Sequence, residues 1–180
     1  MQYHVTLPVL REVIRKLRVG DILSVSGQLF TARDGAHLKM LSMKPKDLPF
    51  DPSSMALYHC GPLMKQENGR WIAISAGPTT SRRMEESEGI LLDRFGFHLI
   101  IGKGGMGQRT RNALMKTGSV YAAFPGGAGV LAAEKITAVP AVHWLEELGM
   151  PEAVWILEVT EFGPLVVAMD SSGKSLYKDL

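Results

Sequence analysis

The sequence is poor in cysteine, since Cys60 is the one cysteine among 180 residues. A disulfide within the chain is therefore impossible, which fits the reducing conditions of a cytoplasm. A lone thiolate also cannot hold an iron–sulfur cluster, because such clusters are bound by several cysteines. Any cluster that this protein uses must be held by another polypeptide, and Cys60 itself is expected to be a small buried apolar group.

The sequence also lacks the features of membrane, secreted and strongly charged proteins. No apolar run is long enough to span a bilayer, and the chain does not begin with the basic-then-apolar pattern of a secretory signal. The formal net charge is only +2, so no strong overall field attracts nucleic acid or a membrane. No Ser-His-Asp order and no His-Glu metal spacing stands out, so we expect no metal ligands here. We expect a cytoplasmic protein.

The composition that remains is that of an ordinary globular domain. Hydrophobic residues make up 46% of the chain and charged residues 21%. A chain of 180 residues can bury one sizeable core and is too short for two comfortable ones. We therefore predict a single domain over residues 1–180.

The middle of the chain alternates strands, glycine-rich turns and helices, which predicts parallel strands joined by helical crossovers. The turn-prone Asn68-Gly69 is expected to join the strands at 56–59 and 71–76. Asp34 is expected to cap an early helix. The fold class is therefore α/β, with a parallel core and an additional β layer. Strands are predicted at 21–27, 29–32, 56–59, 71–76, 98–101, 120–124, 154–159 and 165–168, and helices at 9–17, 34–41, 81–95, 108–116 and 130–135.

The segment from Gly77 to Arg83 is the first candidate anion site. Gly77 bends the chain after a predicted strand, and Thr79 and Thr80 offer hydroxyls and open N–H groups at a helix start. Arg83 projects near the same turn and would meet a docked carboxylate. The plain alternative is a helix capped by Thr80 or Ser81 with Arg83 on a solvated face, and these residues alone slightly favour it.

The loop Gly102-Lys103-Gly104-Gly105 is the second candidate. Its glycines let a ligand approach the backbone, and Lys103 supplies a point charge. It is not a Walker A loop, because no Ser or Thr follows Lys103. It does match the Gly-x-x-Gly loop of KH RNA-binding domains, although Gln108 stands where such a domain would bury an aliphatic residue. A glycine turn with a solvent-facing lysine is about as probable as either functional interpretation.

Two further segments are weaker. Arg33 follows a predicted strand and is a third candidate cation, and His37 lies about one helical turn further on. For this segment alone the stronger alternative is that Asp34 caps the helix while Arg33 and His37 lie on the surface. The turn at 126–129 is predicted to allow close packing of a helix on a strand. In a parallel core, ligands bind beyond the carboxyl ends of the strands, so the two glycine-rich segments above are expected to meet there.

Taken together, these motifs resemble one family, the β subunit or C-terminal half of class I iron–sulfur hydro-lyases. These are the class I fumarases and the similar L(+)-tartrate dehydratases. Several motifs in the same order carry the resemblance over essentially the whole chain, and they displace the KH interpretation. They are 17–21, Arg33-Asp34, 58–62, 77–80, 102–106, 148–152 and 161–165.

The resemblance implies a swivelling β/β/α domain and a partner α subunit whose three cysteines hold a [4Fe-4S] cluster with one iron open for substrate. It places Arg33, Thr79, Arg83 and Lys103 against the dicarboxylate, with Thr80 and Gly104 beside them, and Thr79 as the catalytic residue at the carbon-bound proton. The cations would stabilise the enolate-like charge and the iron would act on the leaving hydroxyl. Threonine is a weak general base, and the sequence shows no group that would activate it.

The leading prediction is therefore a hydro-lyase that interconverts fumarate and L-malate, as a hetero-oligomer with its α subunit and with no binding to nucleic acid or membranes. The β subunit of L(+)-tartrate dehydratase is the nearest alternative, because the two substrates differ by a hydroxyl. A KH-like RNA-binding module acting through Gly102 to Gly105 is the alternative from another class. A homologue retained for assembly without catalysis is a further one.

Overall fold

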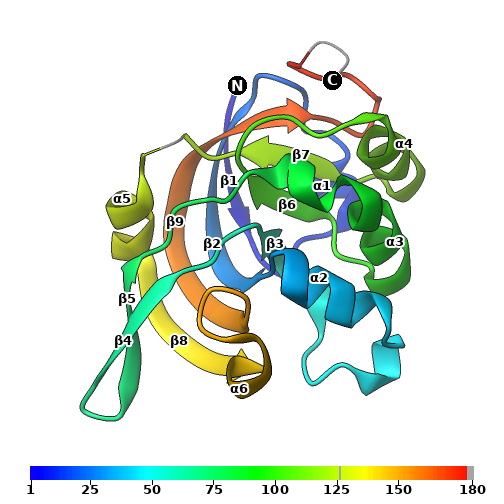
Figure 1. Cartoon of the computed structure of the whole chain (residues 1–180). Coiled ribbons are helices and arrows are strands. Elements are labelled where there is room, and N and C mark those ends of the chain that lie inside the picture. The colour runs from blue at the N-terminus through cyan, green and yellow to red at the C-terminus, as the bar shows by residue number, and fades with distance from the viewer. Residues whose placement is uncertain (126, 178–180) are drawn as a thin grey trace.

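The structure is a computed structural model that describes residues 1–125 and 127–177. It is a mixed α/β fold with a sheet-dominated core (Figure 1). The strands are β1 (Gln2–Thr6), β2 (Ile22–Thr31), β3 (Ala56–Tyr58), β4 (Leu63–Glu67), β5 (Arg70–Ser75), β6 (Leu99–Gly102), β7 (Val120–Ala123), β8 (Ile136–His143) and β9 (Val154–Met169). The helices are α1 (Arg11–Ile14), α2 (Asp34–Leu41), α3 (Glu85–Phe95), α4 (Gln108–Thr117), α5 (Gly129–Glu134) and α6 (Leu145–Leu148), and 3-10 turns cover Pro45–Asp47, Pro52–Ser54 and Ser81–Met84.

The main sheet has a parallel core that closes on itself. Strands β1, β2, β3, β6 and β7 pair in parallel in that order. The long strand β9 then runs antiparallel to β7 and β8, and it also pairs antiparallel with β2. The pairing β2–β3–β6–β7–β9–β2 is therefore a closed ring. The curved path of β9 in Figure 1 shows how one strand reaches both β2 and β7.

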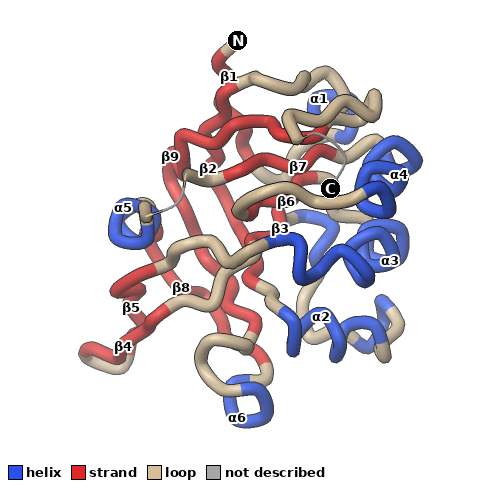
Figure 2. Tube along the Cα trace, turned by 45° about the horizontal axis from the view of Figure 1, so that its top comes forward, coloured by secondary structure: helices blue, strands red, loops and turns tan. Residues whose placement is uncertain are grey.

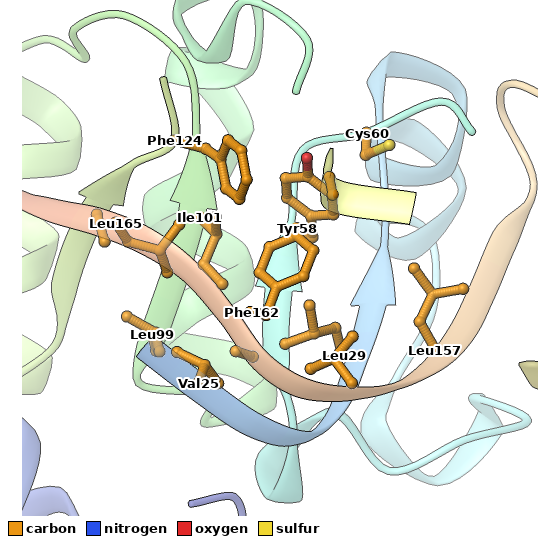
Figure 3. Packing of buried hydrophobic residues seen from close by; sticks show 14 of the residues in the cluster. Val25, Leu29, Tyr58, Cys60, Leu99, Ile101, Phe124, Leu157, Phe162 and Leu165 are labelled. Atoms are coloured by element: carbon orange, nitrogen blue, oxygen red, sulfur yellow. The ribbon is translucent and has the colours of Figure 1, made fainter. Parts of the chain in front are cut away.

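Alternating side chains of these strands form two apolar layers, as the pleat of a strand requires. One layer lies inside the ring and includes Leu29, Tyr58, Ile101 and Phe162. Figure 3 shows these four side chains within the apolar interior. The neighbouring residues of the same strands face outward and pack on the helices. Among them are Phe30, Leu57, Ile100 and Tyr121, together with Leu91 and Leu92 of α3.

Helices α2, α3 and α4 cover one outer side of the ring, whereas the β4–β5 hairpin and α5 lie on the other side (Figures 1 and 2). Helix α5 begins very close to the end of β5: Gly129 O accepts from Ala76 N at 2.9 Å, and a Cβ on Gly129 would lie 2.5 Å from Ser75 Oγ. The close packing predicted for this glycine-rich turn is thus confirmed at Gly129. Gly126, in the same turn, lies outside the described residues.

Several predicted strands have different limits in the structure. The segments 21–27 and 29–32 form the single strand β2, and 154–159 and 165–168 form the single strand β9. The reason is that register shifts between these two strands accommodate Gly27 (φ +111°) and Gly163 (φ +154°) without ending the ladder. Strands β1, β4 and β8 were not predicted. The additional β layer is the β4–β5 hairpin, whereas β8 and β9 extend the main sheet.

The Asn68-Gly69 turn joins β4 to β5, and not β3 to β5 as the sequence suggested. Both turn residues have positive φ, 51° and 76°, which suits a tight hairpin. Strand β3 pairs instead with β2 and β6 in the core. Helices α3 and α4 end close to where they were predicted to end, because Gly96 and Gly118 adopt left-handed C-caps. Helix α1 is shorter than predicted.

Within the described residues, no helix is both long and apolar enough to cross a membrane.

Candidate functional site

The candidate site lies where the parallel strands end. The register aligns Thr31 of β2 with Tyr58 of β3 and Tyr58 with Ile101 of β6. Arg33, Cys60 and Lys103 each follow two residues after this row. The carboxyl ends of β2, β3 and β6 therefore place the Arg33 and Lys103 segments at the same end of the parallel strands. This position was predicted for the Lys103 loop.

The Gly77 to Thr80 segment is attached to this end of the strands by backbone contacts. Pro78 forms a bridge with Cys60, and Thr80 forms one with Lys103. Thr79 N donates to His59 O at 2.7 Å, and Ser81 N donates to Lys103 O at 3.0 Å. The two glycine-rich segments thus meet, although the strand preceding Gly77 is β5 of the separate hairpin.

Arg33 is oriented by a carboxylate that sequence reasoning did not assign a role. Its Nε lies 3.2 Å from Glu152 Oε1, and the other oxygen of Glu152 accepts from Gly35 N at 2.8 Å. The arginine side chain passes over Gly61, where a Cβ would lie 2.7 Å from Arg33 Nη1. The Arg33 side chain is 21% exposed, so it is held in place but still reaches the surface.

Arg83 is paired with Asp34. Arg83 Nη2 lies 2.8 Å from Asp34 Oδ2, and Arg83 Nε donates to Asp34 Oδ1 at 3.2 Å. The guanidinium thus reaches both carboxylate oxygens, one through a hydrogen bond and the other as an ion pair. The predicted N-cap role of Asp34 is wrong: Arg33 is the N-cap residue, without a capping side chain, and Glu152 accepts the Gly35 amide instead. Arg83 remains 50% exposed.

Lys103 is the cation without a carboxylate partner. Its side chain is half-buried, and among residues 1–125 and 127–177 its ammonium makes no hydrogen bond or ion pair. Thr79 is also half-buried, while Thr80 and Gly104 are exposed. Neither Thr80 nor Met84 uses its side chain to cap the helical segment that follows it, so the capping alternative fails for Thr80.

A buried polar layer lies directly beneath these residues. His59 Nε2 contacts Glu88 Oε2 at 2.7 Å, and His59 Nδ1 contacts Ser81 Oγ at 2.9 Å. The side chains of His59 and Glu88 are both fully buried. Tyr121 OH lies 3.0 Å from Ser81 Oγ. Sequence reasoning missed this layer, since these residues are far apart in the chain. His59 is part of the 58–62 motif and Ser81 is considered only as a helix cap.

His37 belongs to the same layer and is not the surface residue considered from the sequence. Its Nδ1 contacts Ser87 Oγ at 2.8 Å, and its Nε2 lies 4.0 Å from Glu88 Oε2. Burial lowers the pKa of His37 to about 4, while the nearby Glu88 carboxylate partly opposes that shift. His37 is therefore neutral at pH 7.

Comparison with known proteins connects this arrangement to a family. The family described as "Fumarase C-terminus" matches residues 2–180. The chain belongs to the fumarase C-terminus family. This confirms the family that the ordered motifs indicated, and it replaces the KH interpretation of the Gly102 to Gly105 loop.

Curated relatives of this fumarase C-terminus chain carry two kinds of name. The L(+)-tartrate dehydratase subunit beta of Escherichia coli K12 is 39% identical over 176 residues, covering 98% of this chain and 87% of that protein. A Methanocaldococcus jannaschii protein with the provisional name L(+)-tartrate dehydratase subunit beta is 47% identical over 169 residues, covering 93% and 87%. A Geobacillus stearothermophilus protein provisionally named fumarate hydratase class I is 45% identical over 174 residues, covering 96% of this chain but 33% of that longer protein.

This fumarase C-terminus chain cannot itself hold a [4Fe-4S] cluster. Its one cysteine, Cys60, is fully buried within the apolar interior of the ring. Burial raises the pKa of the Cys60 thiol, with the Arg33 guanidinium partly opposing the shift, so the thiolate that a cluster needs is disfavoured. The chain's donor atoms therefore do not fit such a cluster.

In the described part of the chain, one group of side chains could hold a metal ion by its composition. It consists of His37, His59 and Glu88, each of which offers one ligand atom within 4.8 Å of the others. All three are buried. The contact between His59 Nε2 and Glu88 Oε2, at 2.7 Å, has the length of a hydrogen bond.

Proposed function

We propose that this chain is the β subunit of a hydro-lyase that acts on a four-carbon dicarboxylate. The observation that carries the proposal is the meeting of Arg33, Thr79, Arg83 and Lys103 at one end of the parallel strands, on segments joined by backbone contacts. Two guanidinium groups and an ammonium match the two carboxylates of such a substrate. Thr80 and Gly104 flank the same opening.

The cations differ in how they would hold a diacid. Glu152 and Asp34 fix the orientation of Arg33 and Arg83, and both arginines keep exposed surface for a ligand. Lys103 has its full charge available, so it would bind one carboxylate and stabilise the negative charge that develops when a carbon-bound proton leaves. We assign Thr79 to that proton, because its backbone is fixed by His59 at the centre of the site.

The site is open and needs a second surface. Arg83 is half exposed and Thr80 and Gly104 are exposed, so solvent reaches the proposed substrate position. An α subunit would close it, and we propose that this domain swivels against that partner in a cytoplasmic hetero-oligomer. The partner would hold the [4Fe-4S] cluster, which supplies a Lewis acid for the leaving hydroxyl. The Geobacillus relative is about three times as long as the matched segment, in keeping with a larger catalytic unit.

The comparisons support tartrate as well as they support fumarate, so the fumarate-first order predicted from the sequence has no additional support. The test of substrate is an anaerobic panel of L-malate, fumarate and L(+)-tartrate on the complex co-expressed with its partner. Turnover of at least one of them is expected. A complex that assembles with its cluster but dehydrates none of these dicarboxylates would contradict the proposal.

The test of the site is Arg83→Ala in the same complex. Losing a guanidinium that binds a carboxylate is expected to lower kcat/KM by about 10²- to 10³-fold, while the complex still assembles. The matched control is Arg82→Ala, because Arg82 is an adjacent exposed arginine. Equal kinetics for the two variants would remove Arg83 from the site.

A further inference from the structure

The buried layer beneath the site contains a connected series of hydrogen bonds that ends on the Lys103 loop. Tyr121 OH contacts Gly104 O at 2.7 Å and Ser81 Oγ at 3.0 Å. Ser81 Oγ also accepts from Lys103 N at 3.0 Å and contacts His59 Nδ1 at 2.9 Å. His59 Nε2 then contacts Glu88 Oε2 at 2.7 Å. Ser81, His59 and Glu88 are fully buried, so water does not complete their hydrogen bonding.

Counting protons assigns one direction to this series. The Gly104 carbonyl can only accept, so the single hydroxyl proton of Tyr121 is donated to it. Tyr121 O–H also donates towards Ser81 Oγ at 3.0 Å, so its proton is shared between the two acceptors. The two lone pairs of Ser81 Oγ thus accept from Tyr121 O–H and Lys103 N–H, and the Ser81 proton is left for His59 Nδ1.

His59 Nδ1 therefore accepts from Ser81, and the proton on His59 Nε2 is donated to Glu88 Oε2. Every hydrogen-bonding position of Ser81 is filled in this arrangement. If His59 Nδ1 instead donated to Ser81, three donors would compete for the two lone pairs of Ser81 Oγ.

Gly102 is adapted to the same series. A Cβ at position 102 would lie 1.9 Å from Ser81 Oγ and 3.0 Å from His59 Nδ1. Gly102 has no left-handed backbone conformation to explain its glycine, so the requirement is space for the Ser81 hydroxyl. This links one glycine of the loop motif to the buried layer rather than to the ligand.

The layer also holds the Thr79 segment. The backbone of His59 donates to Ile101 O at 2.8 Å and accepts from Thr79 N at 2.7 Å. Ser81 N donates to Lys103 O at 3.0 Å, so Ser81 contacts the Lys103 backbone through both its amide and its side chain. Displacing His59 or Ser81 would thus move both loops of the proposed site.

A metal ion is a poorer explanation of this layer. Two ligands of one tetrahedral zinc ion are about 3.3 Å apart, given metal–ligand distances of roughly 2.0–2.1 Å. His59 Nε2 and Glu88 Oε2 are closer than that, at hydrogen-bond length. The directed hydrogen bonds account for all the polar contacts of Ser81, His59 and Tyr121 given above without an ion.

We propose that Glu88, His59, Ser81 and Tyr121 are positioning residues that hold the Lys103-Gly104 backbone, and hence the Lys103 ammonium, through this one-way series of hydrogen bonds. The effect on turnover rests on the proposed function, in which Lys103 binds the diacid. The effect on the loop itself does not.

The experiment compares Tyr121→Phe with Tyr3→Phe in the full chain and in the complex with its partner. Tyr121→Phe removes one hydroxyl without leaving a large cavity, and Tyr3 lies on β1, outside the layer. Hydrogen exchange of the Lys103 amide is expected to be about tenfold faster in Tyr121→Phe only, because its acceptor Ser81 loses a partner. In the complex, kcat/KM for the dicarboxylate is expected to fall about tenfold, with kcat lowered as well as KM raised, because Lys103 is assigned both to the bound carboxylate and to the charge that develops in turnover.

A second pair of variants tests whether His59 needs a hydrogen-bond acceptor at position 88. The amide oxygen of Glu88→Gln can still accept from His59 Nε2–H and leave the Nδ1 lone pair facing Ser81, so this variant is expected to keep Lys103 exchange within about twofold of the original. Glu88→Met cannot accept this hydrogen bond in the same way and is expected to accelerate Lys103 exchange. If Glu88 only filled space, Glu88→Met would keep Lys103 exchange as slow as Glu88→Gln does.

The outcomes separate the two proposals. Unchanged Lys103 exchange in Tyr121→Phe would overturn the positioning role, whatever the activity. One equivalent of zinc or iron bound to the isolated chain and lost in Glu88→Gln would also overturn it. Faster exchange with normal kinetics would leave the hold on the loop standing and refute the step from the loop backbone to the Lys103 ammonium. Faster exchange in a cluster-loaded complex that turns over none of the dicarboxylates would leave the positioning of the loop standing and refute the proposed function.

Discussion

Two polar regions meet at the carboxyl ends of β3 and β6, and their charges are satisfied in different ways. The cationic rim, defined as Arg33, Arg83 and Lys103, is partly exposed, and its two arginines pair with carboxylates at the surface. The buried polar layer, defined as His37, His59, Ser81, Glu88 and Tyr121, has almost no contact with solvent, and its side chains hydrogen-bond chiefly to other side chains. Among the described residues, His37 Nε2 and Glu88 Oε1 have no hydrogen-bond partner.

This difference teaches where stability and ligand binding are located. Exposed ion pairs contribute little to folding, typically ~0.2–1 kcal/mol, because water and salt screen them. Buried polar groups are costly when a partner is removed, because the remaining group cannot be solvated. Rim variants should therefore lose activity and keep stability, whereas variants of the buried layer should lose stability first.

The largest expected effect is on stability, from Glu88→Leu. Removing this carboxylate leaves His59 without its Nε2 partner in a dry interior, which is expected to cost about 3–5 kcal/mol of unfolding free energy. Urea denaturation of the chain measures it. Glu86→Leu, on the same helix with a side chain that is 75% exposed, is the control and should change stability by less than about 1 kcal/mol. Equal losses of unfolding free energy in the two variants would mean that the buried Glu88 carboxylate contributes no more to stability than an exposed one.

The next effect is on activity, from Lys103→Met in the complex. Deleting the unpaired ammonium is expected to lower kcat/KM by about 10²- to 10³-fold, or roughly 3–4 kcal/mol of transition-state stabilisation. The midpoint of thermal unfolding should not move, because Lys103 has no partner to lose in the described part of the chain. The control is Lys116→Met, which removes an exposed lysine paired with Asp93. A large fall in stability for Lys103→Met would place Lys103 in the structural layer instead.

The smallest effect is a pH dependence due to His37. Its pKa is about 4 in the folded chain, lowered by burial from the ordinary 6.5, so between these values the unfolded chain binds more protons. Stability from this residue is therefore fully present above about pH 6.5 and is lost as the pH falls towards 4, by up to about 3 kcal/mol. Urea denaturation at several pH values should show a flatter dependence for His37→Gln. His4→Gln, at an exposed position, should keep the original slope; identical slopes for both variants would mean that His37 is not a buried neutral group.

Local patterns predicted much of the helical side of the fold. Helices α3 and α4 carry their own stop signals in Gly96 and Gly118, and these residues end the helices through left-handed caps. Strands β1 and β8 were missed. The continuity of β2 and β9 was missed as well, since only the pairing of the two strands with each other makes their bulges tolerable.

The same division holds for the site. Thr79, Arg83, Lys103 and Gly104 lie in or beside short glycine-rich motifs that are visible in the sequence. Arg33 is a weaker candidate from its place after a predicted strand, and the resemblance to a family strengthens it. Glu152 and Glu88, which contact Arg33 and His59, could not be identified in advance. A carboxylate on a helix or loop has no local feature that distinguishes a buried or pairing role from a solvated one.

By itself, the sequence determined the family, the alternation of strands and helices at its centre, and the residues of the cationic rim, because these depend on composition and short-range spacing. The tertiary structure alone decided which carboxylate orients each arginine and that a dry layer of hydrogen bonds lies beneath the Lys103 loop. The physical reason is that pairing and burial depend on which distant segments come together, and the closed ring of strands sets that arrangement.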